Sequence, residues 1–502
     1  MHDLLPFLPV SINNVLDSIP YFMPELYLSL LFIVILITDL IFGRNSEKLC
    51  RIVACAGILL VIQRDYQQID LLLYTGQANG RFFFTEMLLL TRTAISFKFI
   101  IDVLAFILLL YFNWDNKLIA HRKGLSDLYS IIIGSVFGLH LMVMAVNLLS
   151  IYLAIEMVSI ASYLMVAYRS ESSFSTEAGL KYVLFGAASS AMMLYGISLI
   201  YAFTGSLNLF TGNLVTGLSQ ANPVAVAFAL ILIFIGIGFK LSFVPVHFWV
   251  PDVYQGASTP VTAWLSTLPK IAAFALVINF LQPFIYYNHW RAFDFRLFLS
   301  AISIITMIAG NFAAVLQKNV KRMLAYSSIG HTGFALMAVV GFTFNHSELT
   351  YYLAVYAIAN IGALALATYF SNVAGVEDMS GYRGLGFKYP AASICFIIVL
   401  VSLTGLPVTA GFTGKLFVFS AVYGFYEQTH NLMLLIMMIT GALTTVVSLF
   451  YYLKIPFNLF LKRSNSVANP MEKSQNIVAL AIIISVMVIL LGIFPNFLLK
   501  GL

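Results

Sequence analysis

Long apolar runs separated by short polar breaks recur along almost the whole of this 502-residue chain. A helix needs about 20 predominantly apolar residues to cross the hydrocarbon core of a bilayer. Charged residues make up only 10% of the chain and apolar residues 61%, whereas an ordinary soluble domain has about 25% charged residues. Because backbone groups inside lipid must be hydrogen-bonded within the protein, we expect an all-α polytopic membrane protein.

The polar breaks divide the chain into fourteen predicted membrane spans. Their approximate limits are 24–43, 49–63, 92–113, 127–145, 147–168, 177–204, 223–250, 257–281, 296–315, 322–343, 347–373, 389–422, 430–460 and 476–499. The polar stretch from Arg64 to Thr91 is expected to form an exposed loop. Because the number of spans is even, both termini are expected on the same side of the membrane.

Basic residues are distributed unequally between the loops. Fifteen Lys and Arg residues fall in the odd-numbered loops and four in the even-numbered loops. Since Lys and Arg concentrate in the cytoplasmic loops of membrane proteins, the odd-numbered loops are predicted to be cytoplasmic and both termini periplasmic. The same loops explain the net charge of +6, so no nucleic-acid partner is expected.

The sequence lacks the usual motifs of a redox centre or a nucleotide site. Its three cysteines, Cys50, Cys55 and Cys395, form no CxxC pair and no Cys/His cluster, which argues against a zinc site, an iron–sulfur site or a disulfide framework. No G-x-G-x-x-G motif follows a strand, and there is no P-loop. We therefore expect no cofactor in this chain. The first 23 residues contain no Lys or Arg, so no cleavable signal peptide is expected.

Two of the predicted spans are expected to be broken helices. The span 223–250 contains Pro245, and the span 389–422 contains the Gly/Pro-rich stretch SLTGLPVTAGFTGK. Proline removes a backbone donor and disrupts a helix. Non-helical backbone at membrane depth is tolerated only where it is buried in protein or lines a cavity. Interrupted helices in corresponding halves of a chain are typical of inverted repeats and ion paths.

Ionisable side chains occur inside several predicted spans, where a charge costs about 2.5–3.5 kcal/mol. The candidate functional residues are Glu156, Lys181, Lys240, His247, Lys270, His331 and Lys415. Burial disfavours the charged form of an amine, and a nearby carboxylate favours it. One glutamate with several lysines can therefore hold and release protons, and histidine can relay them because it titrates near neutrality. We interpret these residues as a proton-handling set.

Each of these residues also has a structural interpretation. Lys240 and Lys415 lie at the predicted breaks and can donate to freed backbone carbonyls. Lys181 is near a helix end, where its long side chain can reach the interface. His247 and His331 can act as hydrogen bonders between helices.

Three other ionisable residues inside the spans are expected to be structural. His140 is expected to form a hydrogen bond between helices. Lys98 and Asp102 are spaced at i and i+4 and are expected to form a local ion pair near a helix boundary.

Five segments resemble the antiporter-like subunits of respiratory complex I. They are GIGFKLSFVPVHFWVPDVYQGASTPVTAWLSTLPK at 236–270, IYLAIEMVSIASYLMVAYR at 151–169, STEAGLKYVLFGAASSAMMLYGISLIY at 175–201, NVKRMLAYSSIGHTGF at 319–334 and LTGLPVTAGFTGK at 403–415. The first is most similar to subunit N (subunit 2) of bacterial NADH:quinone oxidoreductase. The resemblance covers residues 125–460, with Ser258 standing where the family pattern has Pro.

The resemblance implies two inverted five-helix repeats, each with a broken helix. The implied parts are 1–125 with three spans, the repeats 126–281 and 296–460, and a C-terminal helix at 476–502. By motif, Glu156 is the acid that pairs with the central lysine Lys240, which has His247 beside it, and Lys181 lies near that pair. Lys270 and Lys415 continue the charged axis, and His331 lies between the halves.

The implied function is proton translocation coupled to quinone reduction in the bacterial inner membrane. In the family the NADH, FMN, iron–sulfur and quinone sites belong to other subunits, and the neighbours in the membrane arm are subunits K and M. Two alternatives fit the sequence. One is a subunit of an Mrp-type Na⁺/H⁺ antiporter from the same superfamily. The other is a structural membrane scaffold with no ion path.

Overall fold

The computed structural model of the chain describes residues 8–43, 46–77, 80–122, 124–286, 292–341, 346–462 and 475–499. In these residues the chain is helical apart from connecting turns and one short two-stranded sheet. The all-α fold predicted from the apolar runs is therefore confirmed, and the chain is a multi-pass membrane protein by the number and composition of its helices.

The elements follow one another as helices of very different length. They are α1 (Leu8–Ser18), the 3-10 turn η2 (Ile19–Phe22), α2 (Met23–Phe42), α3 (Glu47–Tyr74), β1 (Arg81–Phe83), β2 (Leu88–Leu90), α4 (Arg92–Phe112), α5 (Asn116–Ile119), α6 (Ser126–Met144), α7 (Leu148–Val166), α8 (Ser173–Thr204), α9 (Gly212–Gln220), α10 (Pro223–Leu241), α11 (Trp249–Gly256), α12 (Thr259–Tyr286), α13 (Phe295–Val315), α14 (Val320–Val340), α15 (Ser347–Ala374), the 3-10 turn η4 (Met379–Tyr382), α16 (Leu385–Lys388), α17 (Pro390–Thr404), α18 (Ala410–Thr429), α19 (Leu432–Pro456), the π-turn η5 (Phe457–Leu461), α20 (Gln475–Ile493) and α21 (Asn496–Leu499).

Asparagine side chains fix the starts of several spans. Asn147, Asn222, Asn319 and Asn431 each accept a hydrogen bond from a backbone N–H in the first turn of α7, α10, α14 and α19. The first N–H groups of a helix have no partner within the helix, and a capping side chain satisfies one of them. These polar residues therefore mark where the predicted spans begin.

Twelve helices in the described residues are long and apolar enough to cross a membrane. The two remaining predicted spans, 49–63 and 389–422, are helical as well, in α3 and in the pair α17 and α18. Span 49–63 lies in a helix that carries several charged residues, and span 389–422 is interrupted. Neither therefore forms one helix as long and as apolar as the other twelve. The count of fourteen spans stays a prediction.

The predicted exposed loop between Arg64 and Thr91 is wrong for most of its length. Helix α3 continues to Tyr74, and the segment after it forms the antiparallel hairpin of β1 and β2, in which Leu88, Leu89 and Leu90 are buried. Two polar residues of this stretch, Asp65 and Gln68, are buried inside the helix bundle, where Asp65 forms an ion pair.

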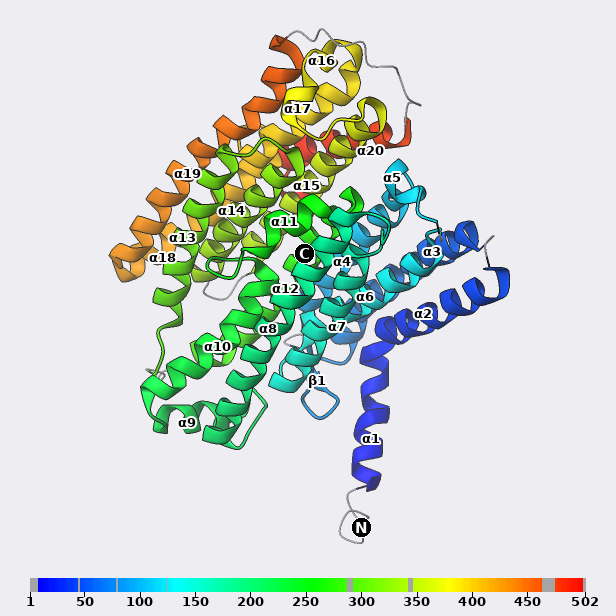
Figure 1. Ribbon diagram of the computed structural model, residues 1–502. Helices are drawn as coiled ribbons and strands as arrows, with labels where there is room; N and C mark the ends of the chain where they lie inside the picture. The colour runs from blue at the N-terminus through cyan, green and yellow to red at the C-terminus, as the bar shows by residue number, and fades with distance from the viewer. Residues whose placement is uncertain are drawn as a thin grey trace.

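Three helices make up the interior of the bundle. The apolar window of α12 is 100% buried and those of α14 and α15 are 94% buried, whereas only 22% of the window that includes α2 is buried. Helix α12 packs against α4 and α6 on one side and against α14 and α15 on the other, and it lies between the N-terminal and C-terminal helices in Figure 1. The charged residue in the middle of α12, Lys270, is therefore distant from the surface of the bundle.

Both predicted helix breaks are present. Helix α10 ends at Leu241 with Ser242 in the left-handed conformation, and α11 starts at Trp249. Helix α17 ends at Gly405, which has a φ of 85°, and α18 starts at Ala410. Glycine accepts this conformation without the strain that a Cβ atom would add. The breaks leave helix ends, with their unpaired backbone carbonyls, inside the bundle.

Helices α13 and α14 approach closely through glycines. A Cβ atom on Gly310 would lie 2.4 Å from the backbone nitrogen of Gly330 and 2.9 Å from the carbonyl oxygen of Tyr326. Because the atoms in the way belong to the backbone of α14, a side chain at position 310 can be accepted only if the two helices move apart. Close contact therefore depends on the absence of a side chain.

Replacing Gly310 by Ala is expected to destabilise the protein by about 1–3 kcal/mol, the usual cost of overpacking. The matched control is Gly424→Ala on α18, where a Cβ atom would meet nothing within 4 Å. There the better helix propensity of Ala is worth up to about 1 kcal/mol in favour of folding. Thermal unfolding of the detergent-purified protein, followed by size-exclusion chromatography, measures both. Equal melting temperatures for the two variants would contradict this account of the α13–α14 contact.

Candidate functional site

A row of buried polar side chains crosses the interior of the bundle. Lys240 on α10, Lys270 on α12, His331 on α14 and Lys415 on α18 are between 2% and 8% exposed. Four of the residues predicted from sequence therefore lie inside the protein rather than at its surface. The helices that carry them are in contact in the order α10, α12, α14 and α18.

Lys270 lies at the middle of this row and is surrounded by hydroxyl and carbonyl groups. Its Nζ donates to Ser328 Oγ at 2.7 Å, to the Ser328 carbonyl at 3.1 Å and to Thr332 Oγ1 at 3.0 Å. Thr332 Oγ1 in turn donates to the Leu241 carbonyl at 2.9 Å, at the end of α10. No carboxylate in the described part of the chain lies within 4.0 Å of this amine.

Aromatic hydroxyls connect Lys270 with His331. The Tyr356 hydroxyl lies 2.8 Å from Ser328 Oγ, and the rings of Tyr356 and His331 face each other with centroids 4.7 Å apart. His331 Nδ1 lies 2.8 Å from the hydroxyl of Tyr352. The positions 328 and 332 on α14, and 352 and 356 on α15, are four residues apart, so each pair faces the same way.

Lys415 occupies the second helix break. Its Nζ donates to the Thr404 carbonyl at 2.8 Å and to Thr445 Oγ1 at 3.3 Å. The Thr404 carbonyl is available because α17 ends there, and a cation at the C-terminal end of a helix is favoured by the helix dipole. A cavity of about 10 Å³, lined in part by His331, Tyr352 and Lys415, joins the break to the rest of the row.

Lys240 has a different environment from the other two central lysines. Its Nζ is buried and has no hydrogen-bond partner among the described residues. Glu156 on α7 acts on it electrostatically, but the two groups form no ion pair within 4.0 Å in the part of the chain that is described. Glu156 is half-buried and accepts a hydrogen bond from Ser190.

The remaining two predicted residues lie towards the edge of the row. His247, in the link between α10 and α11, is half-buried, and its Nδ1 has no partner among the described residues. Lys181 on α8 is 38% exposed and pairs with Glu177 at 2.8 Å and with Asp252 at 2.9 Å. The structure thus brings Lys181 to other acids and not into contact with Glu156.

The expected local pair of Lys98 and Asp102 is wrong. Lys98 forms ion pairs with Glu25 on α2 and Asp65 on α3, while Asp102 faces His140 on α6. Side chains at i and i+4 can meet, but a buried lysine is satisfied better by carboxylates from two neighbouring helices. Glu25, in the first turn of the apolar helix α2, was the sequence signal for this second group of charges.

The arrangement is suited to moving protons. Two of the partners of Lys270 are the hydroxyls of Ser328 and Thr332. A hydroxyl can both donate and accept a hydrogen bond, so it tolerates either a charged or a neutral amine beside it. Among the described residues, the one group with the ligand types and spacing of a metal site is Glu25, Asp65 and His140, which lies outside the row.

Comparison with known proteins agrees with the fold and the motifs. The family profile described as "NADH:quinone oxidoreductase/Mrp antiporter, TM" matches residues 145–444. The chain is 39% identical over 449 residues to NADH-quinone oxidoreductase subunit N 2 of Chloroherpeton thalassium, a match that covers 88% of this chain and 85% of that protein.

Two solved structures share this fold over nearly the whole chain. A chain of respiratory complex I from Thermus thermophilus is 26% identical, with a TM-score of 0.75 and coverage of 95% of this chain and 98% of the other. A chain of the Mrp complex from Dietzia sp. has the same TM-score at 18% identity and covers 95% of both chains. The sequence identity over nearly nine-tenths of the chain decides between the branches: the chain belongs to the NADH:quinone oxidoreductase/Mrp antiporter family of membrane subunits, in the branch of subunit N.

Proposed function

We propose that this chain is a proton-translocating membrane-arm subunit of an NADH:quinone oxidoreductase. The observation that carries the proposal is the set of buried side chains Lys240, Lys270, His331 and Lys415, on helices that contact one another, in a chain whose relatives are subunits N of that enzyme. A purely structural bundle has no need of three buried lysines without carboxylate partners, because replacing buried charges by apolar residues is often neutral or stabilising.

The residues of the row have separate roles in this proposal. Glu156 controls the charge on Lys240, because a carboxylate that comes closer favours the charged form of a buried amine. Lys270 exchanges its proton with the hydroxyls of Ser328 and Thr332, and His331 passes it on towards Lys415. His247 and Lys181 serve at the edge, where they link the row to water. The redox reaction supplies the energy and moves Glu156 and Lys240 relative to each other.

The chain would act as part of a larger assembly. We propose that NADH, FMN, iron–sulfur clusters and quinone bind to other subunits, and that the neighbours in the membrane arm are subunits K and M. The assembly would lie in the bacterial inner membrane, with both termini of this chain in the periplasm, as the distribution of Lys and Arg predicts.

Replacing Lys240 by Met keeps the length of the side chain and removes the proton-carrying amine. Pumping by the intact complex is expected to fall about tenfold or more, because removing a group that transfers protons usually costs about 10²–10⁴-fold in the affected step. Quinone-linked acidification of membrane vesicles, followed with a fluorescent dye, measures the rate. The control is Lys48→Met, at an exposed position of α3. Full pumping by the assembled Lys240→Met complex would favour a structural scaffold.

The hydroxyl of Tyr356 tests the link between Lys270 and His331. Tyr356→Phe removes one hydrogen bond of the row, a loss of about 0.5–1.5 kcal/mol, and pumping should fall about two- to tenfold. Tyr351→Phe is the matched control, since Tyr351 is buried on the same helix and its hydroxyl donates to the Leu491 carbonyl, away from the row. Equal pumping by the two variants in the same vesicle assay would exclude Tyr356 from the path.

The second candidate function is that of an Mrp-type antiporter subunit, because a chain of the Mrp complex has the same fold. Affinity purification of the tagged chain in mild detergent separates the two candidates. We expect peripheral subunits that carry flavin and iron–sulfur absorbance to copurify with it. Copurification of small antiporter subunits alone, with Na⁺-dependent proton exchange, would establish the antiporter instead.

A further inference from the structure

A second group of ionisable side chains lies among the N-terminal helices, apart from the lysine row. It consists of Glu25 on α2, Asp65 on α3, Lys98 and Asp102 on α4, and His140 on α6, and each is 0% exposed. We call these five residues the N-terminal charge cluster. The mechanism proposed for the row makes no use of them.

The cluster is a connected network across four helices. Lys98 Nζ lies 2.7 Å from Glu25 Oε1 and 3.0 Å from Asp65 Oδ1. His140 bridges two acids, with Nδ1 3.0 Å from Glu25 Oε1 and Nε2 2.9 Å from Asp102 Oδ1. Asp65 joins the network through Lys98, and Asp102 joins it through His140. The charge on each member of the cluster therefore affects the others electrostatically.

The cluster is an improbable metal site although three of its members have suitable ligand atoms. The ligand atoms of Glu25, Asp65 and His140 lie within 4.8 Å of one another. The ammonium group of Lys98 already contacts the carboxylates of Glu25 and Asp65, so it provides the positive charge that a metal ion would bring. A metal ion at these ligands would have to displace the Lys98 ammonium group from the two carboxylates.

The charges of the cluster do not balance. Three carboxylates face one lysine and one histidine, so the cluster keeps a net negative charge even when His140 is protonated. Glu25 Oε2, Asp65 Oδ2 and Asp102 Oδ2 are buried and have no hydrogen-bond partner among the described residues. A buried carboxylate without a partner is strongly disfavoured unless it takes up a proton. One further proton on these acids would neutralise the cluster.

A surface cavity reaches Gln68, a neighbour of the cluster. It has a volume of about 330 Å³ and is lined by Ile19, Pro20, Met23, Arg64, Gln67, Gln68 and Leu71. Gln67 is exposed, whereas Gln68 is buried and accepts a hydrogen bond of 2.7 Å from Lys98 Nζ. Gln68 thus separates the cavity from the cluster. Arg64, the charged residue of the cavity wall, donates to Tyr27 and Gln67 and not to the cluster acids.

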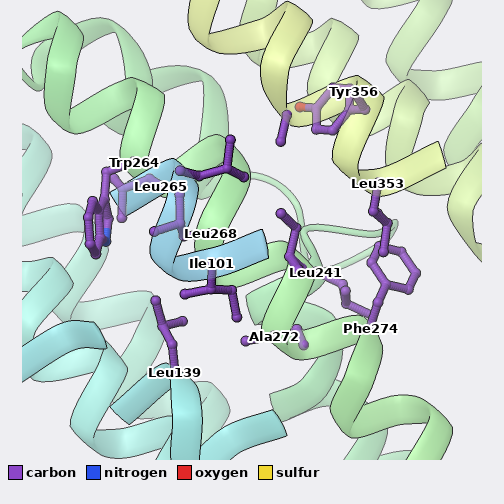
Figure 2. Packing of buried hydrophobic residues seen from close by; sticks show 14 of the residues in the cluster. Ile101, Leu139, Leu241, Trp264, Leu265, Leu268, Ala272, Phe274, Leu353 and Tyr356 are labelled. Atoms are coloured by element: carbon purple, nitrogen blue, oxygen red, sulfur yellow. The ribbon is translucent and has the colours of Figure 1, made fainter. Parts of the chain in front are cut away.

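An apolar layer separates the cluster from Lys270. Helix α12 packs against α4 and α6, and buried apolar residues gather in this region, including Ile101, Leu139, Leu268 and Ala272 (Figure 2). Ile101 and Leu139 directly precede Asp102 and His140 in the chain. Asn279, the buried amide of α12 near α6, donates to the carbonyls of Val143 and Ala145. Within the described residues, α12 thus contributes no charged side chain to the N-terminal charge cluster.

We infer that the N-terminal charge cluster is a separate proton-binding site, which holds one proton beyond those on Lys98 and His140 and exchanges it through the Gln68 cavity. The site does not depend on the proposed pumping function, because it uses none of the residues of the lysine row. Its ligand is a proton, bound between carboxylate oxygens that otherwise have no partner.

Infrared difference spectroscopy of the purified intact complex tests this inference, because a protonated carboxyl has a carbonyl stretch that an ionised carboxylate lacks. At pH 8, where ordinary Asp and Glu are ionised, the wild type should retain a carboxylic-acid band. Asp65→Asn leaves two acids facing two bases and should abolish that band. Asp70→Asn, at an exposed position of the same helix, should leave it unchanged.

The exchange route is tested with deuterated buffer. The band should shift on exchange into D2O, and Gln68→Leu should slow that shift at least severalfold without removing the band. Should Asp65→Asn fail to assemble, Asp102→Asn makes the same change in charge and should also abolish the band. Absence of a carboxylic-acid band in the wild type at pH 8, or identical bands in the wild type and in the variant that lacks an acid, would overturn the proposal. Neither outcome depends on whether the complex pumps.

Discussion

The free-energy cost of burying a charged side chain determines how this bundle is organised. A charge that leaves water must be compensated by hydrogen bonds, an opposite charge or loss of its own proton. The three central lysines differ in this respect: Lys270 is compensated by hydroxyls of α14 and Lys415 by a carbonyl freed at a helix end, whereas Lys240 has no hydrogen-bond partner among the described residues. The helix breaks and the polar faces of α14 and α15 lie beside these buried lysines, and α14 and the end of α17 provide the groups that accept hydrogen bonds from Lys270 and Lys415.

Two kinds of buried lysine follow from this constraint, and they differ in what they can do. Lys98 has two carboxylates within 3.0 Å, so its positive charge is stabilised permanently and any mobile proton of the cluster resides on the acids. Lys270 and Lys415 donate hydrogen bonds to neutral hydroxyl and carbonyl groups and have no carboxylate that fixes their positive charge. The lysines without carboxylate partners are therefore the ones suited to exchange protons, whereas Lys98 holds together α2, α3 and α4.

The sequence alone predicts the helical architecture and most residues of the row. The reason is that hydropathy, and the interruption of helices by Pro and Gly, depend only on the residues of each segment. The breaks at Pro245 and Gly405 and the burial of Lys270 were predicted in this way. The partners of each charge were not, since Ser328 lies 58 residues from Lys270 and Glu25 lies 73 residues from Lys98. The wrong loop prediction between Arg64 and Thr91 has the same origin. From sequence alone, a polar residue that is hydrogen-bonded inside a bundle cannot be distinguished from one that is exposed in a loop.

The central claim is that protons travel along the row of lysines, which requires water or hydroxyl groups to connect them. A cryo-electron microscopy map of the assembled complex in lipid, at a resolution that shows ordered water, tests this directly. The account predicts ordered water and hydroxyl groups in an unbroken hydrogen-bonded path that joins Lys240, Lys270 and Lys415. A dry apolar contact or lipid chains between any two of these amines would contradict it.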